Sequence, residues 1–330
     1  MARWMKLAAG MVISTGCLWL AFRSVSIGQV WTAAAAISIQ TIFACVVLAS
    51  TTLFLRSVRW RILLEASGPL PLATSFAVNS AGQMGNTFLP ARLGDLFRAT
   101  TLGRAGLGTG FVLATVIAER VLDAGFLVLV CSSALATFSN LPPWLTRSAR
   151  LLGVAALAGL AVTLLLPRFE DQVLKGIGWI APQRVQERLT RLAAQFLSGL
   201  RSFHHARRAS GFLFWTVVVW VLDGAGIMVL SHGIGITLSP VEAALVLTSI
   251  ALASVVPAAP GNLGVLQYVA VSVLVPLGVD RAQALSLALI LQALSITTLG
   301  LWGAGSLWFL SARTASPSSV PANEPVRAIS

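Results

Sequence analysis

The sequence predicts an all-α polytopic membrane protein. Of its 330 residues, 56% are hydrophobic and only 10% are charged, and its mean hydropathy is +0.84. Soluble domains carry about 25% charged residues. Because a spanning helix needs about 20 mostly apolar residues, we expect about six full spans plus two interrupted or re-entrant units, or eight spans if both units cross completely. We expect one transmembrane domain over residues 1–310 and a disordered cytoplasmic tail over residues 311–330, which are rich in Ser and Pro.

The six full spans follow from the long apolar runs. The first run lacks a small-x-small cleavage site, so we expect it to remain as a span and not to act as a removed signal peptide. The spans are predicted at residues 7–22, 39–55, 107–138, 149–166, 211–230 and 284–310.

The basic residues indicate the orientation. The formal net charge is +12, but the Lys and Arg lie in short segments between apolar runs, as the positive-inside rule requires. Arg3 and Lys6 precede the first span, and Arg56, Arg59 and Arg61 close the second, so we place both termini and this loop in the cytoplasm. No basic groove with stacking aromatics accompanies the charge, which argues against nucleic acid.

A cytoplasmic, basic segment is predicted over residues 168–208. Within it, apolar residues recur at three- and four-residue steps opposite an Arg-rich face. Such a helix either lies on an anionic inner leaflet or packs on the cytoplasmic loops. The apolar positions are Val185, Leu189, Leu192, Phe196, Leu200 and Phe203.

The first interrupted unit, residues 73–89, is apolar but carries Asn79, Gln83 and Asn86 together with glycines. If both of its flanks are cytoplasmic, it enters the membrane and returns. Backbone of this kind is tolerated only where it is buried in protein or lines a wet cavity. The alternative is an ordinary span with some polar residues.

The second interrupted unit, residues 241–277, contains a Pro-Gly break that resembles the break after the first. We expect both breaks to line a cavity or act in gating, and the two units to form an inverted repeat with opposite orientations, a recurring plan in transporters. The first break includes Pro90 and Gly94; the second includes Pro260, Gly261, Asn262, Gly264 and the nearby Gln267.

Arg92, Asp95 and Arg98 stand where the first break leads into a helix. Guanidinium groups donate two parallel hydrogen bonds to phosphate or carboxylate, and a helix N-terminus attracts anions. A lipid phosphate is therefore the predicted ligand. The alternative is that the arginines are ordinary positive-inside anchors.

Glu119, Arg120 and Asp123 interrupt the apolar run that follows. Charges inside a span are costly and usually mark a pathway or a binding site. Glu119 and Asp123 share one helical face, Arg120 and Asp123 are spaced to pair, and Asp223 is suited to pair with Arg120 or a neighbouring helix. A structural ion pair is the competing interpretation.

Other signals predict no catalytic, metal or cofactor site. Cys17, Cys45 and Cys131 lie in apolar runs without CxxC spacing, and His204-His205 lacks further ligands. The glycines at 106, 108 and 110 are not a dinucleotide fingerprint, and no G-x-S-x-G, H-E-x-x-H or P-loop occurs.

The motifs LPARLGDLFRATTL and ATVIAERVLD, with the later Pro-Gly-x-x-Gly break, resemble the flippase-like transmembrane region of lysylphosphatidylglycerol synthetases. The resemblance extends to about residue 310 and implies a stand-alone member without the synthetase domain. The family pattern is P-x-R-x-G-[DE]-x-x-R followed by E-R-x-x-D. It falls here on Pro90, Arg92, Gly94, Asp95, Arg98, Glu119, Arg120 and Asp123.

The second half departs from the family pattern. The family often has Glu shortly after the Pro-Gly break and Arg in the last long span, where this chain has Gln267 and Gln292. The loss of charge argues against proton or ion coupling in this half.

The resemblance implies a lipid flippase of the bacterial cytoplasmic membrane, acting on an anionic or phosphate-linked lipid such as a phospholipid, glycan-lipid or hopanoid-type lipid. A lipid-synthesis enzyme is the further partner that it implies. The rivals are a membrane-embedded transferase with Asp95, Glu119 or Asp123 as general base, and a non-transporting scaffold for lipid-synthesis enzymes.

Overall fold

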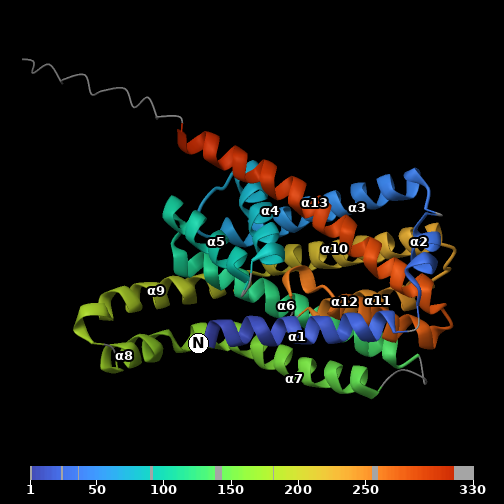
Figure 1. Ribbon diagram of the computed structural model, residues 1–330. Helices are drawn as coiled ribbons and strands as arrows, with labels where there is room; N and C mark the ends of the chain where they lie inside the picture. The colour runs from blue at the N-terminus through green and yellow to red at the C-terminus, as the bar shows by residue number, and fades with distance from the viewer. Residues whose placement is uncertain are drawn as a thin grey trace, which may run out of the picture.

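The computed structural model describes residues 2–23, 25–35, 37–89, 92–137, 143–180, 182–254 and 259–315, and these form helices and turns without a strand (Figure 1). The α-helices are α1 Ala2–Phe22, α2 Ile27–Ala35, α3 Ile39–Leu64, α4 Leu72–Phe88, α5 Leu93–Leu102, α6 Thr109–Leu135, α7 Pro143–Leu165, α8 Glu170–Ile180, α9 Gln183–Arg201, α10 Ala206–Gly233, α11 Pro240–Ala253, α12 Val265–Leu274 and α13 Arg281–Ala315.

The predicted full spans coincide with α1, α3, α6, α7, α10 and α13. Four of the described helical stretches are long and apolar enough to cross a membrane by themselves: Ile39–Leu64, Thr146–Trp179, Ala206–Gly233 and Arg281–Arg313. The protein is therefore an all-α polytopic membrane protein. The predicted tail begins inside α13, which continues to Ala315, and the remainder lies outside the described residues.

The first interrupted unit is a helical hairpin made of α4 and α5. The Ser67 hydroxyl, after α3, donates to the Leu107 carbonyl oxygen, before α6, at 3.5 Å, so the chain returns to the point from which it left. Gly94 of α5 lies so close to α4 that a Cβ on it would be 1.8 Å from the Gly82 carbonyl oxygen. The sequence predicted the unit within residues 73–89, whereas the returning arm, α5, lies beyond them.

The second interrupted unit is also a hairpin, made of α11 and α12. Its ends meet as well, because the Gln283 side chain, in α13, donates to the Ile234 carbonyl oxygen, after α10, at 3.3 Å. At its start, the Ser239 side chain and Glu242 form a capping box around Pro240, which satisfies free backbone N–H groups of the first turn. Between the two arms, the short turn η5, Pro260–Asn262, contacts α4.

The two hairpins make corresponding contacts, as an inverted repeat requires. The helix before each hairpin packs on its counterpart, α3 on α10. The first arm of each hairpin packs on the long helix that follows the other: α4 on α13, and α11 on α6. The second arm of each packs on its own following helix, α5 on α6 and α12 on α13. This pattern favours the inverted repeat predicted from the two Pro/Gly breaks.

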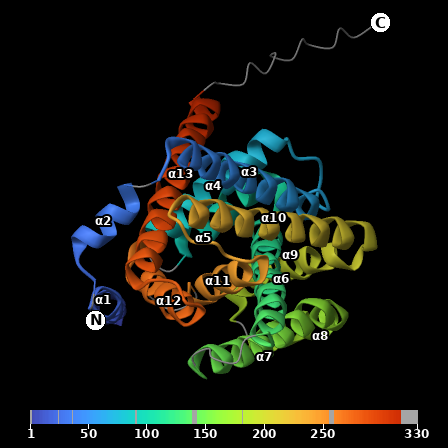
Figure 2. The ribbon, with the colours of Figure 1, turned by 90° about the vertical axis from the view of Figure 1, so that its right-hand side faces the viewer.

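The remaining helices lie outside these two units. Figure 2 shows α1 and α2 at the left edge of the bundle and α7 and α8 along its lower edge. The basic segment that includes α9 packs by its second half on α6, where Leu200 and Phe203 join Ala114 and Ala118 in a buried cluster. Its first half leaves Val185 and Leu189 exposed. The helix thus packs mainly on a spanning helix, α6.

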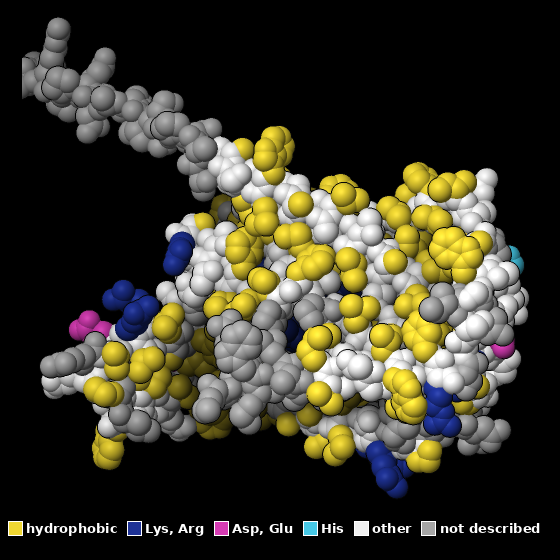
Figure 3. Space-filling model, viewed as in Figure 1, with side chains coloured by type: hydrophobic (Ala, Val, Ile, Leu, Met, Phe, Trp, Pro, Cys, Tyr) yellow, Lys and Arg dark blue, Asp and Glu magenta, His cyan; other side chains and the backbone are white. Residues whose placement is uncertain are grey.

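The surface is consistent with a surrounding bilayer. On the face shown in Figure 3, hydrophobic side chains cover the middle, and most Lys and Arg lie toward the two ends. The start of α1 and the end of α13 lie at the same end of the bundle (Figure 1). The described ends of the chain, at Ala2 and Ala315, therefore lie at one end of the bundle.

Candidate functional site

A buried ion-pair network forms where α3, α5 and α6 meet. Glu119 and Asp123 lie on one face of α6, and both accept hydrogen bonds from Arg59 of α3. The Arg59 guanidinium donates to Glu119 at 2.7 Å and to the two oxygens of Asp123 at 2.6 and 2.9 Å. The Arg59 side chain is 0% exposed and that of Glu119 is 1% exposed. Water is therefore excluded from the centre of the network.

Arg98 of α5 closes this network on its other side. Its Nη2 donates to the second oxygen of Glu119 at 2.7 Å. Its guanidinium carbon lies 4.0 Å from the centroid of the Trp60 ring, a cation–π contact, and its side chain is 0% exposed. Both oxygens of Glu119 are thus held by arginines from two different helices.

Asp95 and Arg120 form the more open part of the network. Arg120 Nη2 donates to Asp95 at 3.1 Å and to Gln83 of α4 at 3.4 Å. The Asn86 side chain binds Asp95 twice, donating to its carboxylate at 2.9 Å and accepting from its backbone N–H at 3.1 Å. The Arg120 side chain is 30% exposed. This end of the network is therefore the one within reach of a ligand.

One pairing differs from the one that sequence spacing favoured. Arg120 does not pair with Asp123 among the described residues; it pairs with Asp95, and Asp123 pairs with Arg59. Of the two partners expected for Asp223, Arg120 or a neighbouring helix, it is the neighbouring helix α3, through Arg56, that pairs with it. Helical spacing of three residues permits a pair, but here stronger partners on other helices are within reach.

Like Arg56, which lines the cavity described below, Arg59 is a site residue that the sequence reasoning missed. It was predicted to be a loop residue because it stands between Arg56 and Arg61 at the end of an apolar run. The structure instead buries it within α3. The available signal was the excess of acidic residues in the next long span, because buried carboxylates need cations and Arg120 alone cannot serve both Glu119 and Asp123.

Arg92 stands apart from the network. It is the N-cap of α5, has a backbone φ of 53°, and is exposed. No hydrogen bond or ion pair joins its side chain to another described residue. Asp95 forms ion pairs with Arg98, at 3.5 Å, and with Arg120, at 3.1 Å, and not with Arg92.

The network carries no net charge. Three guanidinium groups, those of Arg59, Arg98 and Arg120, face three carboxylates, those of Asp95, Glu119 and Asp123. Moving a charge from water into the protein interior costs about several kcal/mol per ion. Only close pairing with an opposite charge, together with further hydrogen bonds, offsets this cost. The network therefore fixes α3, α5 and α6 relative to one another.

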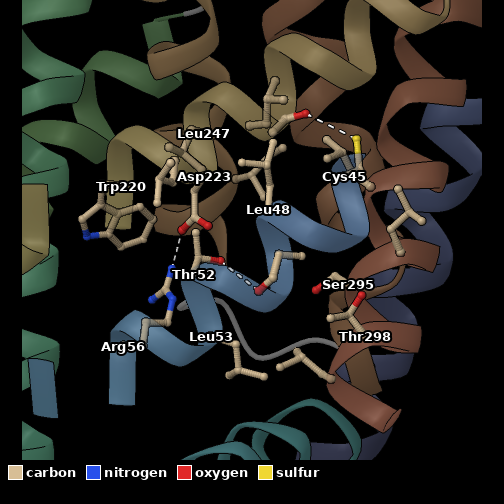
Figure 4. A pocket seen from close by; sticks show the side chains of 18 of the residues that line it. Cys45, Leu48, Thr52, Leu53, Arg56, Trp220, Asp223, Leu247, Ser295 and Thr298 are labelled. Atoms are coloured by element: carbon tan, nitrogen blue, oxygen red, sulfur yellow. Dashed lines mark hydrogen bonds and ion pairs between the residues drawn. The ribbon is translucent and has the colours of Figure 1, made fainter. Parts of the chain in front are cut away.

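A cavity of about 380 Å³ opens beside this network. Its polar end contains Arg120 and Gln83 together with the Arg56–Asp223 ion pair, whose guanidinium also lies 5.0 Å from the centroid of the Trp220 ring. Figure 4 shows Arg56 and Asp223 facing each other at one end of the cavity and Cys45 at the other. The side chains of Arg56 and Asp223 are about one-fifth exposed, at 19% and 20%.

The cavity changes from polar to apolar along its length. On α3 the lining runs from Arg56 through Thr52 to Leu48 and Cys45, and on α10 it runs from Trp220 to Ile227. Because α3 and α10 run in opposite directions (Figure 1), both sequences place the polar residues at the same end. Leucines and isoleucines of α11, α12 and α13 complete the apolar end.

The remaining predicted cavity and gating residues are distributed around this space. Gln83 and Asp223 line the cavity, Asn79 is buried and donates to the Ser57 hydroxyl at 2.9 Å, and Gly94 forms the close contact within the first hairpin. Pro90 lies outside the described residues. Pro260, Gly261, Asn262 and Gly264 form the turn between the arms of the second hairpin.

Gln267 and Gln292 meet in the second hairpin, although the cavity is lined by their neighbours Leu266 and Leu291. The amide of Gln267 donates to Gln292, and that of Gln292 donates to the Gly261 carbonyl oxygen at 2.5 Å. Gln267 also accepts from the Gly264 backbone N–H at 2.7 Å. A neutral pair thus links α12 to α13, where Arg98 and Glu119 link α5 to α6.

Comparisons with known proteins identify the family. Neither a curated protein nor a solved structure matches the chain. Residues 7–303 match the family described as the lysylphosphatidylglycerol synthase TM region, and they include both hairpins, the ion-pair network and the cavity. The chain therefore belongs to the family of lysylphosphatidylglycerol synthase transmembrane regions.

Proposed function

We propose that the protein moves a lipid with an anionic, phosphate-linked headgroup between the two leaflets of the cytoplasmic membrane. The observation that carries this proposal is the cavity lined mainly by α3, α10 and α13, which joins guanidinium groups at one end to an apolar wall at the other. A lipid has the same two-part chemistry. A volume of about 380 Å³ lies within the range of small-molecule sites and is large enough for a headgroup.

The headgroup contacts are assigned to Arg56 and Arg120. Both line the cavity and are partly exposed, and each is paired with a carboxylate, that of Asp223 or Asp95. A phosphate can replace a carboxylate at a guanidinium group with the same two-pronged geometry. Arg92, exposed at the turn of the first hairpin, is suited to an initial contact, while Arg98, fully buried against Glu119, acts only by holding the network.

The two hairpins, α4 with α5 and α11 with α12, are proposed as the moving parts. The η5 turn of the second hairpin contacts α4 of the first, and Gly261 and Asn262 both have positive φ values, 73° and 57°. Such turns join short helices whose relative tilt changes without unfolding a full span. The membrane-enclosed backbone is tolerated there because protein surrounds it.

The transferase alternative requires a carboxylate that is free to accept a proton from the substrate. Each oxygen of Glu119 accepts from an arginine, Asp123 accepts from Arg59 and Trp220, and Asp95 accepts from Arg120 and Asn86. These partners favour transport over acid–base catalysis. A scaffold would need neither the cavity nor partly exposed arginines within it.

The test is lipid movement in proteoliposomes, with fluorescent phosphatidylglycerol in both leaflets and dithionite added outside. Wild type should expose the inner-leaflet probe to quenching. The double variant Arg56→Gln with Asp223→Asn removes the cavity ion pair as a unit, so it should fold and yet lose most of the movement. The matched control is Arg61→Gln, on the same helix and in an exposed ion pair with Glu65.

Three outcomes contradict the proposal. One is wild-type protein that moves none of the anionic lipids offered, and another is a folded double variant that moves lipid at the wild-type rate. The third is a lipid chemically altered by purified protein, detected by mass spectrometry, which would favour the transferase.

A further inference from the structure

The apolar end of the cavity is lined by hydrophobic side chains, which a polar lipid headgroup would not bind. We infer that it holds a hydrocarbon chain of the substrate lipid, which leaves the protein for the bilayer between α3 and α13, beside Ser295. This inference rests on the proposed function, since it concerns the same cavity. It assigns a chain-binding site and a lateral opening to residues outside the charged network.

The apolar end is deep enough for a chain and unsuited to a polar ligand. Cys45 and Arg56, at its two ends on α3, are about 16 Å apart along the helix axis. Leu48, Ile227 and Leu247 come from three different helices and face the space between these two levels. Burying apolar groups there contributes about 0.8 kcal/mol per CH₂ in transfer from water, so the cavity wall offers a chain an environment comparable to the bilayer.

The opening is identified by exposure. Among the residues that line the cavity, Ser295 is exposed, whereas the others are buried or half-buried. Figure 4 shows Ser295 and Thr298 projecting from α13 toward α3. An exposed side chain in the lining marks the place where the cavity wall is least enclosed by protein.

Contacts close α13 against its neighbours on either side of this point. Toward its start, the Ser286 hydroxyl donates to the Val30 carbonyl oxygen of α2 at 3.1 Å. Toward its end, Trp302 donates to the Ser50 hydroxyl of α3 at 3.0 Å, and its ring lies 5.3 Å from that of Phe76. Ser295 lies midway along α13 between these two contacts. The contacts therefore bound the opening on both sides, and the opening faces the side of the bundle.

The first experiment measures occupancy of the apolar end without relying on transport. Cys45 is left as the one thiol, with Cys17→Ser and Cys131→Ser, and its alkylation by N-ethylmaleimide is followed by mass spectrometry in maltoside micelles. Dipalmitoyl phosphatidylglycerol should slow alkylation about tenfold or more, whereas dihexanoyl phosphatidylglycerol, with the same headgroup and short chains, should have little effect. Equal effects of the two lipids would overturn the inference.

The second experiment blocks the opening. Ser295→Trp should slow the movement of dipalmitoyl phosphatidylglycerol about tenfold or more, because the indole fills the gap beside α3. Thr297→Trp is the matched control, since Thr297 is an exposed hydroxyl residue on the same helix that does not line the cavity. Unchanged movement in Ser295→Trp would overturn the lateral opening.

The two hypotheses fail in different ways. Lipid movement by wild type without protection of Cys45 overturns the chain site and leaves the proposed function intact. Protection of Cys45 by the long-chain lipid alone, without movement of any lipid, supports the chain site and contradicts transport.

Discussion

Arg59 and Arg61 are two residues apart on α3 and have opposite surroundings. Arg59 is fully buried and binds Glu119 and Asp123 on α6, whereas Arg61 pairs near the surface with Glu65, one turn along its own helix. The Arg59 ion pairs join two helices in a fully buried site. The Arg61–Glu65 ion pair is partly exposed and joins residues four apart in the sequence. The same residue type therefore contributes very differently to stability.

Arg59→Ala should destabilise the protein by about 3–5 kcal/mol, because it leaves two carboxylates buried with fewer cations. Arg61→Ala, the control, should cost no more than about 1 kcal/mol. Thermal unfolding in detergent, followed by size-exclusion chromatography, would compare the two midpoints. Arg59→Lys should be nearly as harmful as Arg59→Ala, since one ammonium group cannot reproduce the forked contacts. Equal midpoints for Arg59→Ala and Arg61→Ala would refute the role of the network.

The sequence identified the acidic half of this network but only part of its basic half. Charges within an apolar run are visible by composition alone, which is why Glu119 and Asp123 were found. Arg59 was not, because a basic residue at the end of a span looks the same whether it is solvated or buried. Which side of a helix faces the bundle interior depends on packing with helices distant in sequence.

At the scale of elements, the first hairpin depends on backbone contact between its arms. Gly82 and Gly94 let α4 and α5 approach more closely than any side chain would permit. Small residues have this use between membrane helices, where association depends on close packing because the surrounding lipid is itself apolar.

Gly94→Ala should disrupt this hairpin, since its Cβ would lie 1.8 Å from the Gly82 carbonyl oxygen and 2.6 Å from the Asn86 backbone nitrogen. We expect a loss of folded yield and of lipid movement. Gly125→Ala in α6 is the control: a Cβ there meets nothing within 4 Å, so the change should be neutral or should stabilise the helix by about 0.5–1 kcal/mol. The comparison needs expression yield and thermal midpoint in detergent. A Gly94→Ala variant as stable as wild type would show that the arms separate at little cost.

The break in the helix at the first hairpin could be predicted from the sequence, but the folding of α5 back along α4 could not. Pro90, Gly94 and the polar residues before them indicate an interrupted helix. That α5 folds back along α4 depends on the contact between Gly82 and Gly94, which are separated by a turn and belong to different helices. Local propensity does not encode such a contact.

At the scale of the whole molecule, the two halves share their arrangement but not their chemistry. In the first, Arg98 and Glu119 link the second arm to the following helix; in the second, Gln267 and Gln292 do so without charge. The breaks, PARLG and PGNLG, are the main sequence similarity that the two units retain. The repeat was thus only faintly visible in the sequence and becomes evident from the correspondence of helix contacts.

The arrangement of the termini gives a test of orientation. The start of α1 and the end of α13 lie at the same end of the bundle (Figure 1), and the positive-inside rule predicts that this end is cytoplasmic. Green fluorescent protein fused after residue 315 should therefore fluoresce, and alkaline phosphatase fused there should be inactive. Phosphatase fused at Val279, in the turn before α13 at the opposite end, should be active. The reverse pattern would show that the bundle is inverted.

The equal number of positive and negative charges in the ion-pair network also determines which groups the membrane potential can act on. The three arginines and three carboxylates of the network sum to zero, so shifting them together along the membrane normal transfers no net charge. A potential of 100 mV is worth about 2.3 kcal/mol per elementary charge moved across the whole membrane. Under the proposed function that work is done on the lipid, so a headgroup with one negative charge would be driven outward by an inside-negative potential, and a neutral lipid would not respond to it.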